Sequence, residues 1–315
     1  MIRVAVIGAG SFGRNHLRVL REMPDLDLAG VLDTNPARAG AASAEFGCPV
    51  LRDIATLPGA VDAAVVATPT TTHAAIGCAL LDAGIDVLME KPMAESLDSA
   101  LRLRDAAARS GRILQVGHLE RFNPAVQAPR KIITLPLFFE IHRMSVFSPR
   151  SLDVDVLLDL MIHDLEIVLD LVGRKPTEIR AAGLPILSDK VDIANVRLAF
   201  DTGCVANLTA SRVSTERIRK LRLFQPHQYI SLDYQRQEAI AFTVSAAREV
   251  SAESLPVEKG EPLRLELEAF LESVRTRRPP LVSAEDGLAA LELCLDILDK
   301  IKEHTAQIAP RLQAF

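Results

Sequence analysis

Short apolar segments alternate with segments of helical spacing along residues 1–118. Residues 2–7 and 61–67 are almost entirely apolar, as expected for strands that are buried on both faces of a parallel sheet. Residues 14–22 and 74–83, which follow them, have the pattern of helices. Further strands are predicted at residues 28–32, 87–89 and 112–116, and further helices at 38–46 and 94–109. This alternation predicts an N-terminal α/β domain, residues 1–118, of the Rossmann type.

The second half of the chain has a different pattern, in which apolar and polar residues alternate with a period of two. Such strands are predicted at residues 137–142, 179–182, 195–200, 204–210 and 220–224. Asp201-Thr202-Gly203 has the composition of a hairpin turn, residues 250–260 that of a mobile loop, and the last two predicted helices are residues 262–277 and 284–304. Residues 119–315 are therefore predicted to form an α+β domain with an open, mainly antiparallel sheet.

Composition narrows the class of protein. The chain has 315 residues, which favours two domains, and a net charge of -5, which argues against a nucleic-acid partner. No apolar run approaches the length of a membrane span, and no basic, apolar leader precedes the first strand. The four cysteines lie far apart and form no CxxC pair, which indicates reduced thiols. We therefore expect a cytoplasmic protein.

A glycine-rich turn follows the first predicted strand. It reads Gly8-Ala9-Gly10-Ser11-Phe12-Gly13, and Asp33 lies 20 residues beyond its last glycine, at the end of the second strand. Glycines allow a tight turn and close approach of the backbone to a pyrophosphate, and an acid at this distance accepts the ribose hydroxyls. The alternative is a glycine-rich turn with an incidental acid. The context favours a dinucleotide site made by Gly8, Gly10, Ser11, Phe12, Gly13 and Asp33.

Asp33 also bears on the choice of cofactor, because a carboxylate repels a 2′-phosphate. We therefore expect NAD rather than NADP, with Arg38 stacked on the adenine or, alternatively, bound to a phosphate. Thr68 and Thr70 follow the third strand, where hydroxyls can reach the ribose or nicotinamide. His73 is either a further cofactor contact or an ordinary first residue of a helix.

Glu90-Lys91-Pro92 ends the fourth predicted strand, at the edge of the sheet where α/β domains bind their ligands. A lysine in this place is often simply solvated. Here it lies between a nucleotide-binding pattern and an Asp/His pair, so we predict that cofactor and substrate meet at Lys91. Glu90 is counted among the cofactor-binding residues.

The second chemical signal lies in an apolar stretch, residues 156–172. Asp159, His163, Glu166 and Asp170 share one face of a predicted helix. A solvated stripe is the simplest interpretation, but this one lacks Lys, Arg and Gln. Asp159 and His163 are one turn apart and suit a general base, in which the carboxylate orients the imidazole. No third and fourth ligand has suitable spacing, so no metal is predicted.

The glycine-rich turn, Glu90-Lys91-Pro92 and Asp159-x-x-x-His163 together resemble the glucose–fructose oxidoreductase / inositol dehydrogenase / MocA family. The resemblance covers nearly the whole chain and implies that Lys91, Asp159 and His163 are catalytic. One position departs from the family, which commonly has glycine where this chain has Met161. Whether His163 or Lys91 accepts the proton is left open by the sequence.

A narrower resemblance comes from residues 118–125 (HLERFNPA), 158–164 (LDLMIHD), 192–195 (DIAN) and 203–212 (GCVANLTASR). These segments are similar to those of UDP-N-acetylglucosamine 3-dehydrogenases. The resemblance implies NAD-dependent oxidation of the sugar 3-hydroxyl to a ketone. In that group an aminotransferase then uses the ketone to make a 3-amino sugar for lipid A.

A nucleotide-sugar substrate needs cations or backbone donors for its diphosphate. The candidates for the diphosphate are Arg121, Asn123 and Arg143, and those for the sugar are Lys91, Asp159 and His163. The basic residues between 212 and 222 are more simply explained as the solvated edge of a strand. Two alternatives remain: a dehydrogenase or reductase of a free sugar, inositol or another nucleotide sugar, and an NAD(H)-binding redox sensor. The uncovered face of the predicted sheet indicates a homo-oligomer, a dimer or tetramer.

Overall fold

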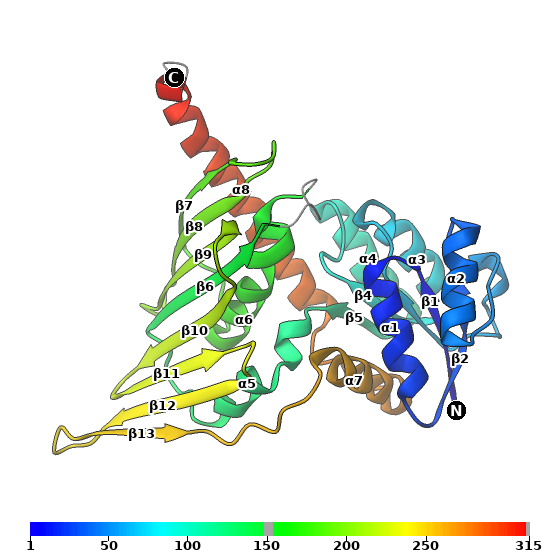
Figure 1. Ribbon diagram of the computed structural model, residues 1–315, viewed down its shortest axis with the longest axis horizontal. Helices are drawn as coiled ribbons and strands as arrows, with labels where there is room; N and C mark the ends of the chain where they lie inside the picture. The colour runs from blue at the N-terminus through cyan, green and yellow to red at the C-terminus, as the bar shows by residue number, and fades with distance from the viewer. Residues whose placement is uncertain (148–153, 313–315) are drawn as a thin grey trace. The chain divides into compact units, whose positions relative to one another are not determined.

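The computed structural model describes residues 1–147 and 154–312. The chain forms two compact units (Figure 1). Unit 1 contains Met1–Leu119 and Glu261–Leu291, and unit 2 contains Glu120–Gly260 and the chain from Glu292 onward. In the described parts of the chain, no helix combines the length and the apolar character that crossing a bilayer requires.

Unit 1 is built on a parallel sheet of five strands in the order β2-β1-β3-β4-β5, which confirms the predicted Rossmann architecture. Because β1 lies between β2 and β3, the order reverses beside it, and ligands bind at such a point in open α/β sheets. The strands are β1 (Ile2–Ile7), β2 (Leu26–Leu32), β3 (Ala63–Val66), β4 (Asp86–Glu90) and β5 (Leu114–Gly117).

Five helices belong to unit 1, and their ends follow from local sequence. Asn35 begins α2 because its side chain accepts the N–H groups of Ala37 and Arg38, and Gly47 ends the helix at a φ of 68°. Ser96 caps α4 in the same way, through the N–H of Ser99. The helices are α1 (Ser11–Glu22), α2 (Pro36–Phe46), α3 (His73–Asp82), α4 (Leu97–Ser110) and α7 (Pro262–Thr276).

Helix α7 belongs to unit 1, which differs from the predicted boundary at residue 118. Its apolar face, including Leu267 and Phe270, packs in one buried cluster with Leu17 and Leu20 of α1. The periodicity of residues 262–277 predicted the helix correctly but does not specify which core it covers. The N-terminal domain is therefore completed by a segment from the second half of the chain.

Unit 2 contains an eight-stranded sheet in the order β13-β12-β11-β10-β6-β9-β8-β7. Among the strands that the structure describes, only β6 and β9 pair in parallel, so the predicted mainly antiparallel sheet is confirmed. The strands are β6 (Phe138–Val146), β7 (Glu178–Leu184), β8 (Ile193–Ala199), β9 (Val205–Ser214), β10 (Ile218–Gln225), β11 (Gln228–Asp233), β12 (Glu238–Val244) and β13 (Val250–Ser254).

The last three strands were not predicted. In particular, β13 lies in the segment that we expected to be a mobile loop, and all five of its side chains are exposed. An edge strand with no buried face has no alternation of apolar and polar residues, so it resembles a loop in sequence. The predicted hairpin at residues 201–203 is present between β8 and β9, with Gly203 at a φ of 83°.

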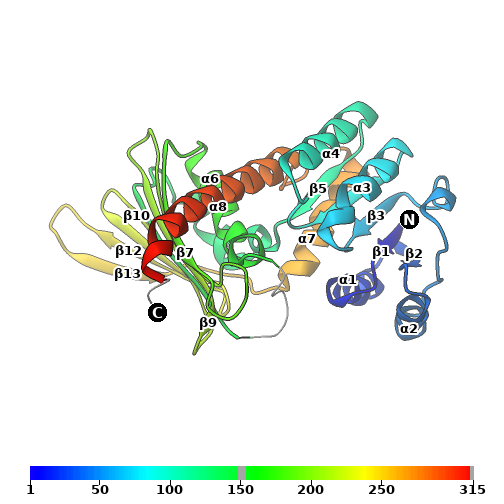
Figure 2. The same cartoon turned by 90° about the horizontal axis from the view of Figure 1, so that it is seen from above.

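Helices cover one face of this sheet (Figure 2). Helix α6 (Ile162–Val172) follows a π-helical turn, η5 (Leu157–Met161), and α8 (Ala284–Leu312) contacts β7 where Ile301 lies against Gly183. A short helix, α5 (Pro124–Gln127), also belongs to this unit. A π-turn within a helix shifts the side chains that follow it, and such turns are frequent at functional sites. Here the turn carries Asp159.

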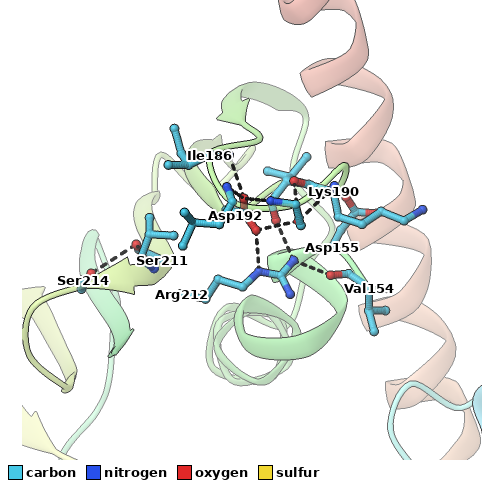
Figure 3. Close-up of polar contacts among 12 residues, drawn as sticks. Val154, Asp155, Ile186, Lys190, Asp192, Ser211, Arg212 and Ser214 are labelled. Carbon is cyan, nitrogen blue, oxygen red and sulfur yellow. Dashed lines mark hydrogen bonds and ion pairs between the residues drawn. The ribbon is translucent and has the colours of Figure 1, made fainter. Parts of the chain in front are cut away.

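A buried clamp fixes the segment that leads into η5 (Figure 3). At its centre Asp192 accepts the backbone N–H groups of Ile186, Leu187 and Ser188, at 2.6–3.0 Å. Arg212 of β9 lies 3.0 Å from the same carboxylate, and both residues are buried. The clamp therefore joins β9 to the loop before β8.

The same arginine connects this clamp to the start of η5. Arg212 donates to the carbonyl oxygens of Val154 and Val191. Val191 in turn donates its N–H to Asp155 at 2.9 Å and accepts the N–H of Val156 at 2.9 Å. The position of the turn that carries Asp159 is thus set from the sheet side by buried polar contacts.

The clamp predicts a loss of stability in acid. Burial alone would raise the pKa of Asp192, but the N–H donors of Leu187 and Ile186 outweigh it and hold the pKa at about 2. A carboxylate with a lowered pKa stabilises the fold above its unfolded pKa, and the contribution disappears as pH falls through the folded pKa. We expect Asp192→Asn to lower the free energy of unfolding by about 2 kcal/mol near neutral pH, with the difference shrinking between about pH 4 and pH 2.

Chemical denaturation of both proteins across this pH range measures the difference. Asp189→Asn is the matched control, because Asp189 is exposed in the same loop. A difference between Asp192→Asn and the unsubstituted protein that does not change with pH would contradict the assignment.

Candidate active site

The glycine-rich turn closes tightly between β1 and α1. Gly8 has a φ of +103°, and a Cβ there would lie 2.5 Å from the carbonyl oxygen of Ala67. A Cβ at Gly13 would lie 1.8 Å from the carbonyl oxygen of Gly8. Both positions therefore require glycine, the first for its backbone conformation and the second for the close approach of α1 to the turn.

An open pocket of about 620 Å³ lies beside this turn. Gly10 lines it, and a Cβ at Gly10 would meet nothing within 4 Å, so this position leaves room for a ligand. The N-terminal turn of α1 starts here, and such a turn favours an anionic group. The full lining is Ala9, Gly10, Ser11, Arg14, Ala37, Arg38 and Ala41. Three of the predicted cofactor residues are brought together in it, whereas Arg14 was not predicted.

Phe12 and Asp33 complete the predicted nucleotide site. Phe12 is 51% exposed in the first turn of α1. Asp33 accepts the N–H of Ala9 at 2.7 Å through one oxygen and the N–H of Asn35 at 2.8 Å through the other. The carboxylate thus ties the glycine turn to the end of β2, and its remaining lone pairs suit the hydroxyls of a ribose.

The loop after β3 carries the threonines predicted to face the cofactor. Thr68 and Thr70 are both partly exposed, and the hydroxyl of Thr68 accepts that of Thr72 at 2.8 Å. His73 is buried and is the first residue of α3, as in the second of its two interpretations. Its ring nitrogens face the carbonyl oxygens of Thr68 at 2.9 Å and Pro92 at 3.0 Å. Burial lowers the pKa of His73, and the two carbonyl oxygens oppose this shift.

Lys91 follows the last residue of β4, as predicted, and is half-buried. Its backbone N–H donates to the Glu90 carboxylate at 3.2 Å. The other oxygen of Glu90 lies 2.6 Å from Nε2 of His16 on α1. Both carboxylate oxygens of Glu90 therefore have partners within the protein, and one of them supports the backbone at Lys91. The sequence had instead predicted Glu90 to be a cofactor-binding residue.

Asp159 and His163 lie in unit 2, on η5 and on α6, and both are half-buried. The other two acids of the predicted stripe have basic partners from other segments. Arg121 pairs with Glu166 and Asp170, and Arg130 also pairs with Asp170. These partners explain why the stripe contains no cation of its own. The predicted reaction groups therefore come from both units, Lys91 from unit 1 and Asp159 with His163 from unit 2.

Arg121 was predicted to bind a diphosphate, but its side chain is buried between the carboxylates of Glu166 and Asp170. Asn123 and Arg143, predicted for the same role, lie in a second buried network of polar side chains. Arg143 binds Asp164 at 2.6 and 2.8 Å and Glu120 at 2.9 Å. Asn123 donates to Glu120 at 3.0 Å and to the carbonyl oxygen of Tyr234 at 3.1 Å.

Charge pairing keeps this second network ionised. Burial alone would lower the pKa of Arg143, but Asp164 and Glu120 raise it well above its usual range. Both terminal nitrogens of Arg121 and the side-chain donors of Asn123 and Arg143 are directed at protein groups, so these three side chains act as internal supports of unit 2. Apart from Glu120 and Asn123, the polar partners in these networks are distant in sequence, so the spacing of residues gave no signal for them.

The position of Asp33 predicts the basis of cofactor preference. Asp33→Asn keeps an oxygen that can accept the N–H of Ala9 and removes the negative charge that repels a 2′-phosphate. We expect the KM for NADP to fall by about tenfold, which corresponds to about 1.4 kcal/mol, while the KM for NAD rises. Steady-state kinetics with both cofactors measure this change, and Asp27→Asn, an exposed acid on the strand that precedes Asp33, is the control. An unchanged KM for NADP would show that Asp33 does not discriminate.

The pairing of Arg121 predicts a loss of stability rather than of substrate affinity. Arg121→Met leaves Glu166 buried without its cation, so we expect the free energy of unfolding to fall by about 3–5 kcal/mol. Arg130→Met removes a more exposed partner of Asp170 and should cost less. Chemical denaturation measures both variants. A stable Arg121→Met protein with a raised KM for a sugar nucleotide would instead support the predicted diphosphate contact.

Comparison with known proteins identifies the family. A profile described as "Oxidoreductase family, NAD-binding Rossmann fold" matches residues 2–118, and one described as "GFO/IDH/MocA C-terminal domain" matches residues 140–225. The chain is 35% identical to UDP-N-acetylglucosamine 3-dehydrogenase of Acidithiobacillus ferrooxidans, over 94% of this chain and 96% of that one. It is 27% identical to inositol 2-dehydrogenase of Rhizobium meliloti, over 93% of this chain and 94% of that one.

Solved structures agree with these similarities. A structure of UDP-N-acetylglucosamine 3-dehydrogenase from Acidithiobacillus ferrooxidans superposes with a TM-score of 0.91 at 34% identity, covering 96% of this chain and 98% of that one. A putative myo-inositol dehydrogenase from Sinorhizobium meliloti has a TM-score of 0.83 at 23% identity, with 96% and 98% covered, and shares the fold. The chain belongs to the GFO/IDH/MocA family and is an NAD-dependent oxidoreductase.

Proposed function

We propose that this chain oxidises the 3-hydroxyl of UDP-N-acetylglucosamine to the 3-ketone with NAD. The observation that carries the proposal is the similarity to UDP-N-acetylglucosamine 3-dehydrogenase over nearly the full length of both chains. Lys91, Asp159 and His163, the residues that the chemistry requires, are all present. Among the named relatives, the dehydrogenases of sugars and inositols act on a secondary alcohol, which suits the same set of groups.

Oxidation of a secondary alcohol removes a hydride from carbon and a proton from oxygen. The residues of the glycine-rich turn would hold NAD, which would supply the acceptor for the hydride. The imidazole of His163 accepts the hydroxyl proton, and Asp159 orients the ring and stabilises the charge that the ring acquires. The ammonium group of Lys91 positions the hydroxyl and stabilises the negative charge that develops on its oxygen.

The product of this reaction defines the class of enzyme that would use it. A 3-keto sugar is a substrate for transamination, so an aminotransferase is the proposed downstream partner and a 3-amino sugar of the lipid A type the proposed end product. We also propose a homo-oligomer. Its support is a row of half-buried aromatic rings across β6, β10, β11 and β12, which a second subunit could cover. Phe138 lies 5.7 Å from Phe224, Phe224 and Tyr229 stack at 4.8 Å, and Tyr229 and Phe242 stack at 5.0 Å.

A second candidate is a dehydrogenase of inositol or of a free sugar. The similarity to inositol 2-dehydrogenase supports it. So does the pairing of Arg121 and Arg143 with carboxylates of the protein, because a nucleotide sugar would need free cations for its diphosphate and an inositol or free sugar would not. A redox sensor that binds NAD(H) without turnover has no need of Lys91, Asp159 and His163, and their presence together speaks against this alternative.

The substrate test is the growth of NADH absorbance with the protein, NAD and UDP-N-acetylglucosamine. An aminotransferase and an amino donor are added to remove the ketone. We expect a signal that depends on the sugar nucleotide. A flat trace from a protein that binds NAD would reject this substrate, and inositols and free sugars would then be tested in the same assay.

The same assay tests Lys91. Lys91→Met should lower kcat by about 100-fold or more while the Kd for NAD stays within about twofold, because the ammonium acts on the reacting oxygen. Lys259→Met, an exposed lysine, is the control. Turnover by Lys91→Met equal to that of the unsubstituted protein would contradict the mechanism.

A further inference from the structure

A second group of titratable side chains lies in unit 1, at the end of β4. It consists of His16 on α1, Glu90 on β4 and Glu266 on α7. All three are buried, and one nitrogen or oxygen atom from each lies within 4.8 Å of the other two. The mechanism above uses none of them directly. They are nevertheless adjacent to Lys91 through Glu90.

Glu266 is the unusual member of this group. It is 1% exposed, and within residues 1–147 and 154–312 neither of its carboxylate oxygens has a hydrogen-bond partner. Glu90, by contrast, meets His16 at 2.6 Å and the N–H of Lys91 at 3.2 Å. Two adjacent buried carboxylates do not both ionise, because like charges repel and neither is well solvated. Glu266 is therefore the carboxyl that retains its proton, because neither of its oxygens has a donor to stabilise a charge.

The environment of Glu266 on each side supports this division. The titratable groups that face it are His16 from α1 and Glu90 from β4, while Gln115 of β5 donates to its backbone carbonyl oxygen at 3.1 Å. Burial raises the pKa of Glu266 well above its usual range, and Glu90 raises it further. At neutral pH this leaves a neutral, buried acid within 4.8 Å of the Glu90 carboxylate.

We propose that Glu266 and His16 are positioning residues for Lys91. Glu266 packs beside Glu90 as a neutral acid, and His16 holds the Glu90 carboxylate where it accepts the backbone N–H of Lys91. On the other side of the lysine, His73 contacts the carbonyl oxygen of Pro92, so the strand end is supported from both α1 and α3. This proposal rests on the proposed role of Lys91 in the reaction.

The protonation of Glu266 can be tested without substrate. Infrared spectra of the full chain at neutral pH should contain a carbonyl band of a protonated carboxylic acid that is missing from Glu266→Gln. The control is Glu268→Gln, an exposed acid on the same helix, which should retain the band. A spectrum of Glu266→Gln that keeps the band would overturn the proposal. One metal ion bound per chain and lost in Glu266→Gln would overturn it too, since a ligating carboxylate is ionised.

Kinetics then test the positioning role with whichever alcohol the unsubstituted enzyme oxidises. Glu266→Ala should lower kcat by about tenfold or more with the KM for NAD within about twofold, because a small displacement of Lys91 slows the reaction. Glu266→Gln should recover most of this loss. An unchanged kcat for Glu266→Ala, or a loss confined to the KM for NAD, would overturn the proposal.

The two experiments separate this proposal from the proposed function. If UDP-N-acetylglucosamine is not a substrate, the infrared result is unaffected and the kinetics use another alcohol. If Glu266→Ala does not fold, the infrared result with Glu266→Gln still decides whether Glu266 is neutral.

Discussion

The pairing of buried charge is the constraint on which most of unit 2 depends. Arg143 is fully enclosed, and its charge is tolerated only because Asp164 and Glu120 meet it from α6 and from the segment before α5. Arg121 and Arg212 repeat the arrangement with other acids. Each arginine joins segments that are distant in sequence, so the half-buried Asp159 and His163 are carried by elements whose positions are fixed on several sides.

Features that depend on neighbours in sequence could be predicted. The turn from Gly8 to Gly13, the placement of Asp33 at the end of β2 and that of Lys91 after β4 follow from strand and helix patterns alone. The helix that carries His163 was also predicted, but the π-turn that carries Asp159 was not, so the register between these two residues does not follow from the regular pattern. These elements confirm the predicted fold class, because a local pattern specifies a local structure.

Features that depend on packing between distant segments could not be predicted from the sequence. Arg121 was predicted to contact substrate because it is a cation just beyond the last strand of the first domain, and its acidic partners lie far along the chain. Helix α7 was assigned to the second domain because periodicity does not indicate which core a helix covers. Glu266 gave no signal, since nothing in its neighbourhood along the chain distinguishes it from Glu268, which is exposed. A buried acid is recognised only from what surrounds it.

The exposed edge strand β13 has a consequence for how the protein behaves in concentrated solution. Its free edge presents backbone groups to which a strand of another molecule can add, and Val250 is 69% exposed there. The strand is only five residues long and contains Glu253 among serines and an alanine. A short, charged edge is a poor template for a growing fibril, so this polar sequence protects the sheet against polymerisation even though it contributes nothing to the core.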